Sequence, residues 1–484
     1  MTALHELTAL EQWTLIRSGE VTPGDLVEHY LARIERLNPE VGALTVVAGG
    51  RARDAAARLT ETVSTAAPLF GLPLVDKELT ARAGQRTTYG SRLFADNVPE
   101  ASDELARHLD EAGAISLGAS AAPEFGLPSY TESRVAPPAR TPHALDRGAG
   151  GSSGGAAAAV AAGLVPFAPG SDGGGSIRIP AAACGIVGLK PSRGRVPAGS
   201  GLASLAGLVV AGPLARTVAD AALLLDALVS ASPWPFATRA AGPAAEGPFL
   251  AHAVRGEGRV QVGVLTESPW QLDYALTIAP EARHALDRAI RHLDAMGHGV
   301  DDIDLGPSDD WAGYSDAFRI VWMAAAAGIP AESDAELALL EPLTAWLVAR
   351  GRELPVARLT AALSWLSGFE RRLIARFSSV DVVMTPALAL TPRPLGWYDA
   401  GDAERNFAQQ VQYTPWTSMI NVAGLPAITI PMGLSRESDG ELSDRPGMPM
   451  GVQLIGRPGG EATLLAVAAQ LERRLRLPST PVLD

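Results

Sequence analysis

Apolar residues recur every three or four positions in several stretches of the chain, which is the spacing of a buried helix face. The clearest stretch has its apolar positions at Leu26, Val27, Tyr30, Leu31 and Ile34. Thr22 before it suits the N-cap, and Pro23 suits the first helical position. Further helices are predicted in the alanine-rich stretch after Gly155 and over residues 51–60, 103–112, 215–229, 281–296 and 462–474.

Short apolar runs lie between these helices and predict buried strands. The run from Leu69 to Val75 ends at Asp76 and Lys77, so we expect Lys77 at the tip of a strand. Further strands are predicted over residues 114–117, 164–169, 380–386, 427–431 and 450–455. Helices that alternate with strands are typical of an α/β layer architecture.

Composition and charge narrow the classes of function. Of the 484 residues, 47% are hydrophobic and 19% are charged, which suits a globular protein with a sizeable core. The formal net charge of −13 disfavours nucleic acids and anionic membranes as partners, because binding them usually needs a basic face. The N-terminal residues lack the layout of a signal peptide, and no apolar run reaches the roughly 18 residues of a membrane span, so we expect a cytoplasmic protein.

The counts of cysteine and lysine add to this picture. Cys184 is the one cysteine, so neither an intrachain disulfide nor a cysteine-rich zinc site can form, and its apolar neighbours predict a place in the core. Among the 40 basic residues, only Lys77 and Lys190 are lysines. Because arginine cannot lose its proton, a lysine in so arginine-rich a chain is a candidate for a role that needs a neutral amine.

Two serines, Ser152 and Ser176, are flanked by glycines and stand 24 residues apart. Glycines 173–175 permit a tight turn before Ser176, and their N–H groups could converge on one oxygen. Such a cluster of donors is an oxyanion hole, which stabilises the tetrahedral intermediate of acyl transfer. A phosphate-binding loop is disfavoured, because the chain has no G-x-x-x-x-G-K-[ST] string.

The segment Gly150–Gly154 also fits G-x-S-x-G, the nucleophile elbow of α/β-hydrolases, with Ser152 as nucleophile. That fold needs a histidine after the serine, usually near the C-terminus. No histidine follows His298, so this alternative is disfavoured. A lysine can replace the histidine as base if burial lowers its pKa, and Lys77 fits that need. Asp76 and Glu78 would oppose the shift, but neighbours in a strand point to the opposite face.

The segment Gly150–Ala181 resembles the signature of the amidase signature family almost throughout. It contains GGSSGG, a small-residue helix, Asp172, and Gly-Gly-Ser-Ile-Arg-x-Pro ending at Pro180. Further blocks that look like the family lie at 71–77, 123–126, 184–191, 212–217 and 421–427, so the similarity runs from about residue 5 to about residue 475. The resemblance implies an amidase signature fold, in which helices cover both faces of a central mixed, twisted sheet.

The resemblance also implies a Ser–Ser–Lys triad that hydrolyses an amide through an acyl-enzyme. Ser176 would be the nucleophile, Ser152 the middle serine after a cis peptide bond, and Lys77 the terminal base. The residues that the resemblance assigns to the oxyanion hole are Gly173, Gly174, Gly175 and Ser176. Those that it assigns to support of the network are Ser153, Asp172 and Arg178. It implies no metal and no cofactor, and it leaves Lys190 a structural role.

The substrate is less sharply indicated. The stretch Tyr413–Thr417 looks like members that act on 6-aminohexanoate cyclic dimers, which suggests a small linear or cyclic amide. The candidate residues for the acyl pocket are Phe125, Trp322, Met323, Tyr413 and Trp416. The main alternative is the A subunit of a glutamine-dependent tRNA amidotransferase, which would use the same triad inside a complex. A catalytically silent scaffold is a further alternative, which the intact triad disfavours.

The chain shows no internal repeat and no clean linker, so we predict one domain over residues 1–484. Within it we expect a helical N-terminal segment at about residues 1–65 and a loop-rich region on the substrate side at about 230–420. Residues 230–258, rich in Ala, Pro and Gly, are expected to form a surface connection. The expected partner is a small-molecule amide, and a homodimer is a reasonable oligomeric state.

Overall fold

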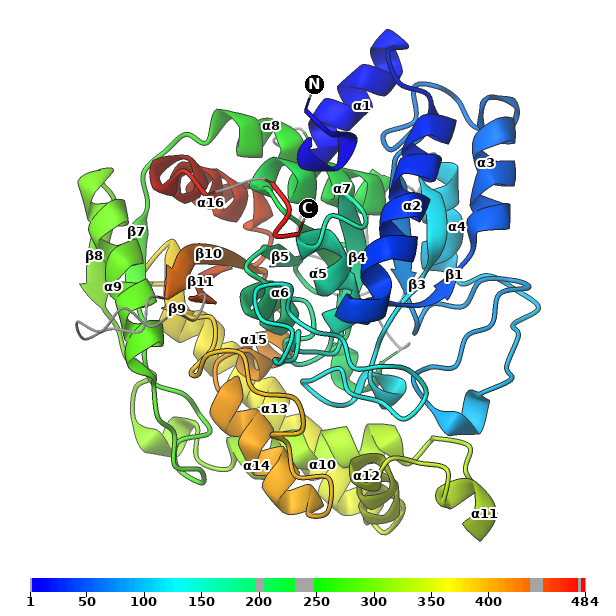
Figure 1. The fold of residues 1–484 in the computed structure, drawn as a ribbon. Coiled ribbons are helices and arrows are strands. Elements are labelled where there is room, and N and C mark those ends of the chain that lie inside the picture. The colour runs from blue at the N-terminus through cyan, green and yellow to red at the C-terminus, as the bar shows by residue number, and fades with distance from the viewer. Residues whose placement is uncertain (1, 197–203, 231–247, 436–446, 478–479, 484) are drawn as a thin grey trace.

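The computed structural model describes residues 2–196, 204–230, 248–435, 447–477 and 480–483. The centre of this described part is a mixed sheet of eight strands with helices on both faces (Figure 1). In order across the sheet, the strands are β4 (Phe167–Asp172), β6 (Val210–Ala215), β5 (Val187–Lys190), β10 (Ala427–Ser435), β11 (Met448–Gly456), β9 (Val382–Pro386), β7 (Gln261–Val264) and β8 (Gly299–Asp302). Neighbours are antiparallel from β4 to β9, whereas β9, β7 and β8 run parallel.

Within the same described residues, the N-terminal part of the chain forms a second sheet of three strands. Its strands, in order, are β1 (Leu44–Val47), β3 (Ile115–Ser120) and β2 (Pro73–Lys77). Strand β3 pairs antiparallel with β1 and parallel with β2. All the residues of β2 are buried, and Lys77 is the last of them. The apolar run before Lys77 therefore does end in a strand tip, as predicted, although the strand begins only at Pro73.

Helices pack on both sheets. The helices that pack on the second sheet are α2 (Pro23–Val41), α3 (Gly49–Thr62) and α4 (Glu104–Glu111). Those that contact one another along one face of the large sheet are α7 (Val218–Ser230), α8 (Phe249–Arg255), α9 (Pro280–Ala295) and α16 (Glu461–Leu475). Helix α1 (Ala9–Ser18) contacts α7. Helix α5 (Gly154–Ala161) contacts strands of both sheets, and it packs against α6 (Arg178–Cys184), which contacts the large sheet.

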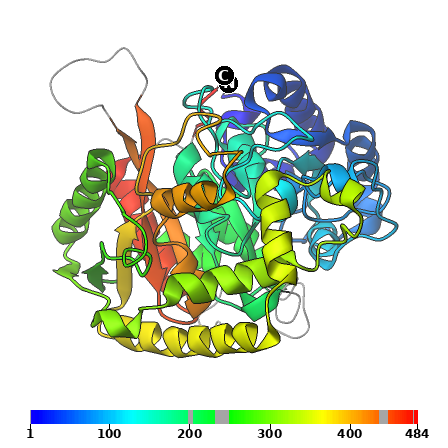
Figure 2. The same ribbon diagram turned by 90° about the horizontal axis from the view of Figure 1, so that it is seen from below.

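A further group of helices lies beside the sheet, coloured yellow-green to orange in Figure 2. Its members are α10 (Tyr314–Ala326), α11 (Asp334–Leu337), α12 (Pro342–Arg352), α13 (Val356–Phe377), α14 (Ala403–Tyr413) and α15 (Ser418–Ala423). Helix α10 packs against α12 and α13, α12 against α14, and α13 against α15. Aromatic side chains fill the space between them, including the stacked rings of Trp365 and Phe369.

The predicted helix starts and strands are largely confirmed. Helix α2 begins at Pro23, and Thr22 and Asp25 form the reciprocal hydrogen bonds of a capping box before it. The helices expected at 51–60 and 281–296 lie within one to two residues of α3 and α9. The strand expected at 164–169 is displaced, because β4 begins at Phe167 and continues to Asp172.

The region that we expected to be loop-rich, at about 230–420, also contains helices: α8 to α15 occupy about half of its described residues. Apolar residues at helical spacing cover one side of α10, α13 and α14, and these sides form a shared core. Of the surface connection expected at 230–258, residues 231–247 lie outside the described residues. The remainder includes helix α8, whose Phe249 and Ala253 are buried.

Helix α5 is buried over its whole length and contacts strands of both sheets. Its residues are almost all glycine and alanine, so backbones can approach it closely on every side. A Cβ atom on Gly155 would lie 2.3 Å from the amide nitrogen of Ala121 and 2.4 Å from the carbonyl oxygen of Ala43. Only glycine fits there. The small residues of α5 thus bring the two sheets together and place its N-terminus between the ends of β2 and β4.

Candidate active site

Four short segments meet at the N-terminus of α5. Lys77 comes from the tip of β2, and Ser152 and Ser153 come from the turn just before α5. Ser171 and Asp172 end β4, and Ser176 follows in the glycine turn before α6. The structure therefore brings together the lysine and the two serines that the sequence singled out, although they lie up to 99 positions apart in the chain.

The side chain of Lys77 is 2% exposed and is held among hydroxyl and carbonyl oxygens. Its Nζ donates hydrogen bonds to Oγ of Ser152 at 2.8 Å, Oγ of Ser171 at 3.0 Å and the carbonyl of Ser171 at 3.3 Å. Burial lowers the pKa of Lys77 to about 7, against the opposing charge of Asp172. An amine with that pKa is largely neutral at slightly alkaline pH and can accept a proton from Ser152.

The two acids beside Lys77 do not face its amine. Asp76 pairs with the buried guanidinium of Arg82 and accepts a hydrogen bond from Ser116 at 2.6 Å. Glu78 accepts hydrogen bonds from the hydroxyl and the backbone N–H of Thr88. Alternation along β2 turns Asp76 away from the amine, as the sequence predicted, whereas Glu78 lies in the turn after the strand and is held there by Thr88.

Asp172 organises the glycine turn that carries Ser176. Its carboxylate accepts hydrogen bonds from the backbone N–H groups of Gly175 at 2.7 Å and Ile177 at 3.2 Å. It also pairs with both ends of the Arg178 guanidinium at 2.9 Å, and both side chains are buried. Burial alone would raise the pKa of Asp172, but Arg178 holds it well below its usual value. Asp172 is therefore a permanent anion that fixes the turn.

Of the four backbone N–H groups expected to form an oxyanion hole, that of Gly175 is already committed to Asp172. The N–H groups of Gly173, Gly174 and Ser176 are the remaining candidates. Gly175 has a φ of +135°, a conformation that L side chains rarely adopt, and a Cβ there would lie 2.5 Å from Oγ1 of Thr417. The turn thus requires glycine at this position for both backbone conformation and space.

Ser152 and Ser176 are linked through the backbone. The N–H of Ser153 donates to the carbonyl of Ser176 at 3.1 Å, and the Gly151–Ser152 peptide bond is cis, as the resemblance implied. In the described residues no hydrogen bond joins the two hydroxyls directly. Such bonds are often long without substrate and shorten when a complex forms, so this geometry is compatible with a relay.

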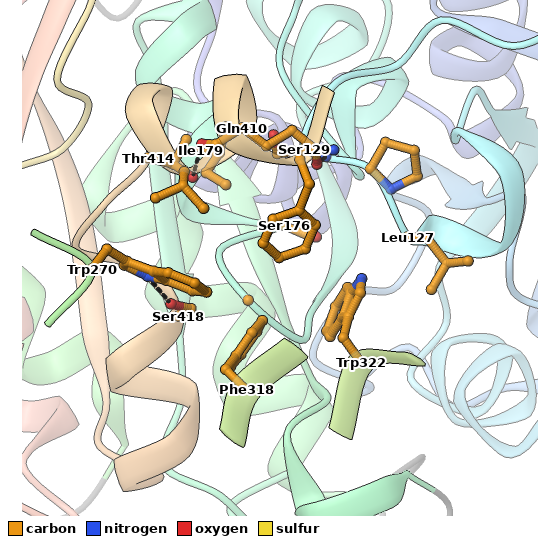
Figure 3. A pocket seen from close by; sticks show the side chains of 14 residues that line it. Leu127, Ser129, Ser176, Ile179, Trp270, Phe318, Trp322, Gln410, Thr414 and Ser418 are labelled. Carbon is orange, nitrogen blue, oxygen red and sulfur yellow. Dashed lines mark hydrogen bonds between the residues drawn. The ribbon is translucent and has the colours of Figure 1, made fainter. Parts of the chain in front are cut away.

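A cavity of about 60 Å³ opens onto Ser176 (Figure 3). Its walls are mainly aromatic and aliphatic, and Figure 3 shows Trp270, Phe318 and Trp322 gathered around Ser176. Ser129 and Gln410 lie together on another side of it and are joined by a 2.8 Å hydrogen bond from the backbone N–H of Ser129 to the amide oxygen of Gln410.

The model of the amidase family matches residues 25–465. The chain belongs to the amidase signature family. AmiB2 of Mycobacterium tuberculosis (strain H37Rv) is 38% identical over 472 residues, which cover 96% of this chain and 95% of that protein.

Two further relatives in this family match nearly all of this chain. The A subunit of the glutamyl-tRNA(Gln) amidotransferase of Roseiflexus sp. (strain RS-1) is 32% identical over 520 residues, with 100% of both chains covered. A solved structure of 6-aminohexanoate cyclic dimer hydrolase superposes with a TM-score of 0.87 at 30% identity, over 99% of this chain and 100% of that one. The expected family and the α/β fold with its mixed sheet are thus confirmed, and the chain is an amidase-family enzyme.

This amidase places only part of the expected acyl pocket at the cavity. Trp322 lines it, whereas Met323, its neighbour on α10, lines a separate charged hollow. Tyr413 and Trp416 are buried in the packing of α14 and the segment after it, and Phe125 packs edge-on against Phe94. These four do not line the cavity. Sequence reasoning could not place α10 and α14 on the same cavity, where Phe318 and Trp322 of α10 and Phe407 of α14 face Ser176.

Other residues of this amidase site were missed. Ser171 contacts Lys77 directly, and Asn421 donates to the carboxylate of Asp172 at 2.8 Å. Arg178 also donates to the side chains of Asn421 and Gln453. A signal existed for Ser171, because it precedes Asp172 at the end of a predicted apolar run. None existed for Gln453, which reaches the site from β11 across the sheet.

Cys184 and Lys190, the remaining candidates, are buried and contact backbone carbonyls. Cys184 is buried, its pKa is raised to about 12 by burial, and its thiol faces the carbonyl of Ala149. Lys190 is also buried, and its Nζ donates to the carbonyl of Pro191 at 2.9 Å rather than to either serine. In the described ranges no group of three His, Cys, Asp or Glu side chains is arranged to hold a metal ion. No helix in those ranges is long and apolar enough to cross a membrane.

Proposed function

We propose that this enzyme hydrolyses a carboxylic amide through an acyl-enzyme on Ser176, with Ser152 and Lys77 as its proton relay. The observation that carries the proposal is the 2.8 Å hydrogen bond between Nζ of Lys77 and Oγ of Ser152, made in a buried site that lowers the pKa of Lys77 to about 7. The resemblance to other family members supports the assignment of the roles.

In the first half-reaction, Oγ of Ser176 forms a bond to the amide carbon while its proton passes to Ser152, and the proton of Ser152 passes to neutral Lys77. Backbone N–H groups of Gly173, Gly174 and Ser176 stabilise the oxyanion. The C–N bond then breaks, and Ser152 returns a proton to the leaving amine as Lys77 replaces it. Water repeats these steps on the ester and releases the carboxylate, so protons balance over the cycle.

The proposal is tested by activity-based labelling. A fluorophosphonate should label the wild-type chain on Ser176, and Ser176→Ala should abolish both labelling and amide turnover. Lys77→Arg keeps the charge but cannot accept a proton at neutral pH, so the labelling rate should fall about 100- to 10,000-fold. A labelling rate near wild type in Lys77→Arg would show that Lys77 is not the base.

A second candidate function is that of an amidotransferase A subunit, favoured by the 32% identity to such a subunit over the full length of both chains. The same chemistry would then release ammonia from glutamine inside a complex. The two candidates differ in what the isolated chain does. An independent amidase should hydrolyse simple amides without added subunits, whereas a complex-dependent subunit should need its partners for turnover. A small linear or cyclic amide is the substrate class that we favour.

A further inference from the structure

The walls of the cavity at Ser176 carry no charge. Of the 14 residues that line it in the described part of the chain, none is Asp, Glu, Lys, Arg or His. The ring of Phe318 stacks on that of Trp322 at 5.4 Å and meets that of Trp270 edge-on at 5.5 Å. Trp270 also meets Phe407 edge-on at 6.0 Å. These rings, with Leu127, Ile179 and Val411, surround Ser176 with apolar surface.

Two of the polar side chains in these walls, Ser418 and Gln410, are already engaged with the protein. Oγ of Ser418 accepts a hydrogen bond from the indole N–H of Trp270 at 3.0 Å and shares one with the hydroxyl of Tyr314 at 2.9 Å. The amide of Gln410 accepts from the N–H of Ser129 and donates to Asn406 at 2.8 Å. These bonds hold the rings and the wall in place, and the groups that remain for a bound molecule are neutral.

The charged side chains of the same elements lie on the other side of the wall. Arg319 follows Phe318 on α10, pairs with Glu404 of α14 and lies over the outer face of the Phe407 ring at 5.2 Å. With Asp273 and Met323 it lines a separate hollow of about 730 Å³. The helices thus separate apolar side chains towards Ser176 from charged side chains towards the second hollow.

From this separation, and resting on the proposed function, we propose that the acyl group accepted by Ser176 is uncharged and apolar, and that free glutamine is excluded. On binding, the α-ammonium and α-carboxylate of glutamine would lose their hydration in a cavity that offers no ionic partners. The free energy of this desolvation is much larger than the free energy gained by burying a methylene chain. A site that recognised glutamine would need charged side chains in its walls. The substrate class is therefore aliphatic or aromatic carboxamides.

Butanamide and glutamine are a matched pair of substrates, because glutamine is butanamide with an ammonium and a carboxylate on its last carbon. We expect kcat/KM for butanamide to exceed that for glutamine by about 100-fold or more. A ratio near one, or in favour of glutamine, would overturn the inference. Labelling of Ser176 by an alkyl fluorophosphonate and by one with a carboxylate on its chain gives the same comparison without turnover, and the alkyl probe should react about 10-fold faster or more.

The labelling result separates the two proposals. Equal labelling by both probes would overturn the apolar acyl group and leave Ser176 as the nucleophile. Labelling of Ser176 by neither probe would overturn the proposed function, and the inference would fall with it. Faster labelling by the alkyl probe supports both.

Two lysine substitutions on α14 test which side of the helix selects the uncharged acyl group. Val411→Lys puts an ammonium into the cavity wall, so it should lower kcat/KM for butanamide about 10-fold or more and favour 4-carbamoylbutanoate, an anionic amide of similar length. Ala408→Lys puts the same group on the side of α14 that faces the charged hollow and should leave the ratio of the two substrates within about threefold of wild type. If the two folded variants had the same ratio of kcat/KM for the two substrates, Val411 would not belong to the wall that selects the acyl group. If Val411→Lys does not fold, the comparison of butanamide with glutamine in the wild type still tests the inference.

Discussion

The side-chain nitrogen of Lys77 lies 3.0 Å from the hydroxyl of Ser171, which is part of neither serine motif. Because Ser171 also offers its carbonyl, it supplies two of the three acceptors around the amine, and Ser152 supplies the third. Ser171 thus aims the amine at Ser152 and, as an acceptor, favours its protonated form. We therefore expect Ser171 to be a positioning residue, which acts through Lys77.

Ser171→Ala should lower kcat/KM and shift the pH dependence. Loss of one acceptor removes a hydrogen bond that stabilises the charged amine by about 1.5 kcal/mol, so the pKa of Lys77 should fall by about one unit. The midpoint of the pH–rate profile should therefore move to lower pH while the plateau rate falls.

Ser171→Thr is the control for this effect, because it keeps the hydroxyl. The profile of Ser171→Thr should have its midpoint near that of wild type. A Ser171→Ala profile with an unchanged midpoint would mean that Ser171 supports the fold without acting on Lys77.

The lowered pKa of Lys77 sets the sign of the pH dependence. Below about pH 7 the amine is protonated and cannot accept the proton of Ser152, and above about pH 7 it is neutral. The rate of Ser176 labelling by a fluorophosphonate should therefore rise tenfold per pH unit at low pH and level off above about pH 7. The residual rate of Lys77→Arg should lack this rise.

The second lysine is a matched control for the pH effect. Burial also lowers the pKa of Lys190 to about 7, but its nitrogen donates to the carbonyl of Pro191. Lys190→Met should keep the rise in labelling rate between acidic and neutral pH. If the rise disappeared in a folded Lys190→Met protein, Lys190 rather than Lys77 would be the titrating group.

The buried pair of Asp172 and Arg178 should be important for stability. Arg178→Ala leaves the Asp172 carboxylate buried without its cation, which should lower the free energy of unfolding by about 3–5 kcal/mol. Denaturant unfolding followed by circular dichroism measures this change. Labelling of Ser176 should fall as well, since Asp172 holds the glycine turn through Gly175.

Arg358 offers a contrasting pair at the surface. It pairs with Asp316 through two hydrogen bonds of 2.9 and 3.0 Å, but both side chains are more than half exposed. Arg358→Ala should cost only about 0–1 kcal/mol, because water solvates the partner that remains. Similar losses for the two arginines would contradict the importance of burial at Asp172.

The sequence predicts the site better than its surroundings, for physical reasons. Lys77, Ser152 and Ser176 each lie in a local pattern with a chemical meaning: a strand tip in a lysine-poor chain, or a serine among glycines. The only sequence signal for Ser171 was its position next to Asp172. Gln453 contacts Arg178 from β11, a strand far from Arg178 in the sequence. The walls of the cavity depend on how α10 and α14 pack, and local periodicity carries no information about helix partners.

The same contrast holds for the fold. Capped helices such as α2 and short apolar strands such as β9 follow from local spacing, and their positions were predicted closely. The helices between residues 314 and 413 were not predicted, although apolar residues recur at helical spacing in α10 and α13, and no side-chain cap marks the start of either helix. The order of the eight strands in the described sheet pairs segments about 240 residues apart, such as β5 and β10, which no local pattern specifies.

Gly155 lies in α5, the helix between the two sheets. A methyl group there would lie 2.3–2.4 Å from backbone atoms of Ala121 and Ala43, so the helix must move. Gly155→Ala should therefore lower the free energy of unfolding by about 1–3 kcal/mol, as overpacking of a core usually does. Because Ser152 lies just before this helix, a movement of α5 also displaces the proposed relay, and labelling of Ser176 should slow.

Gly50 in α3 is the matched control, because a Cβ atom on it meets no atom within 4 Å. Gly50→Ala should raise the free energy of unfolding by up to about 1 kcal/mol, since alanine has the higher helix propensity. Urea unfolding of both variants, with labelling rates measured in parallel, gives the comparison. If Gly155→Ala were as stable and as reactive as Gly50→Ala, close packing of α5 between the sheets would not be what holds Ser152 beside Lys77.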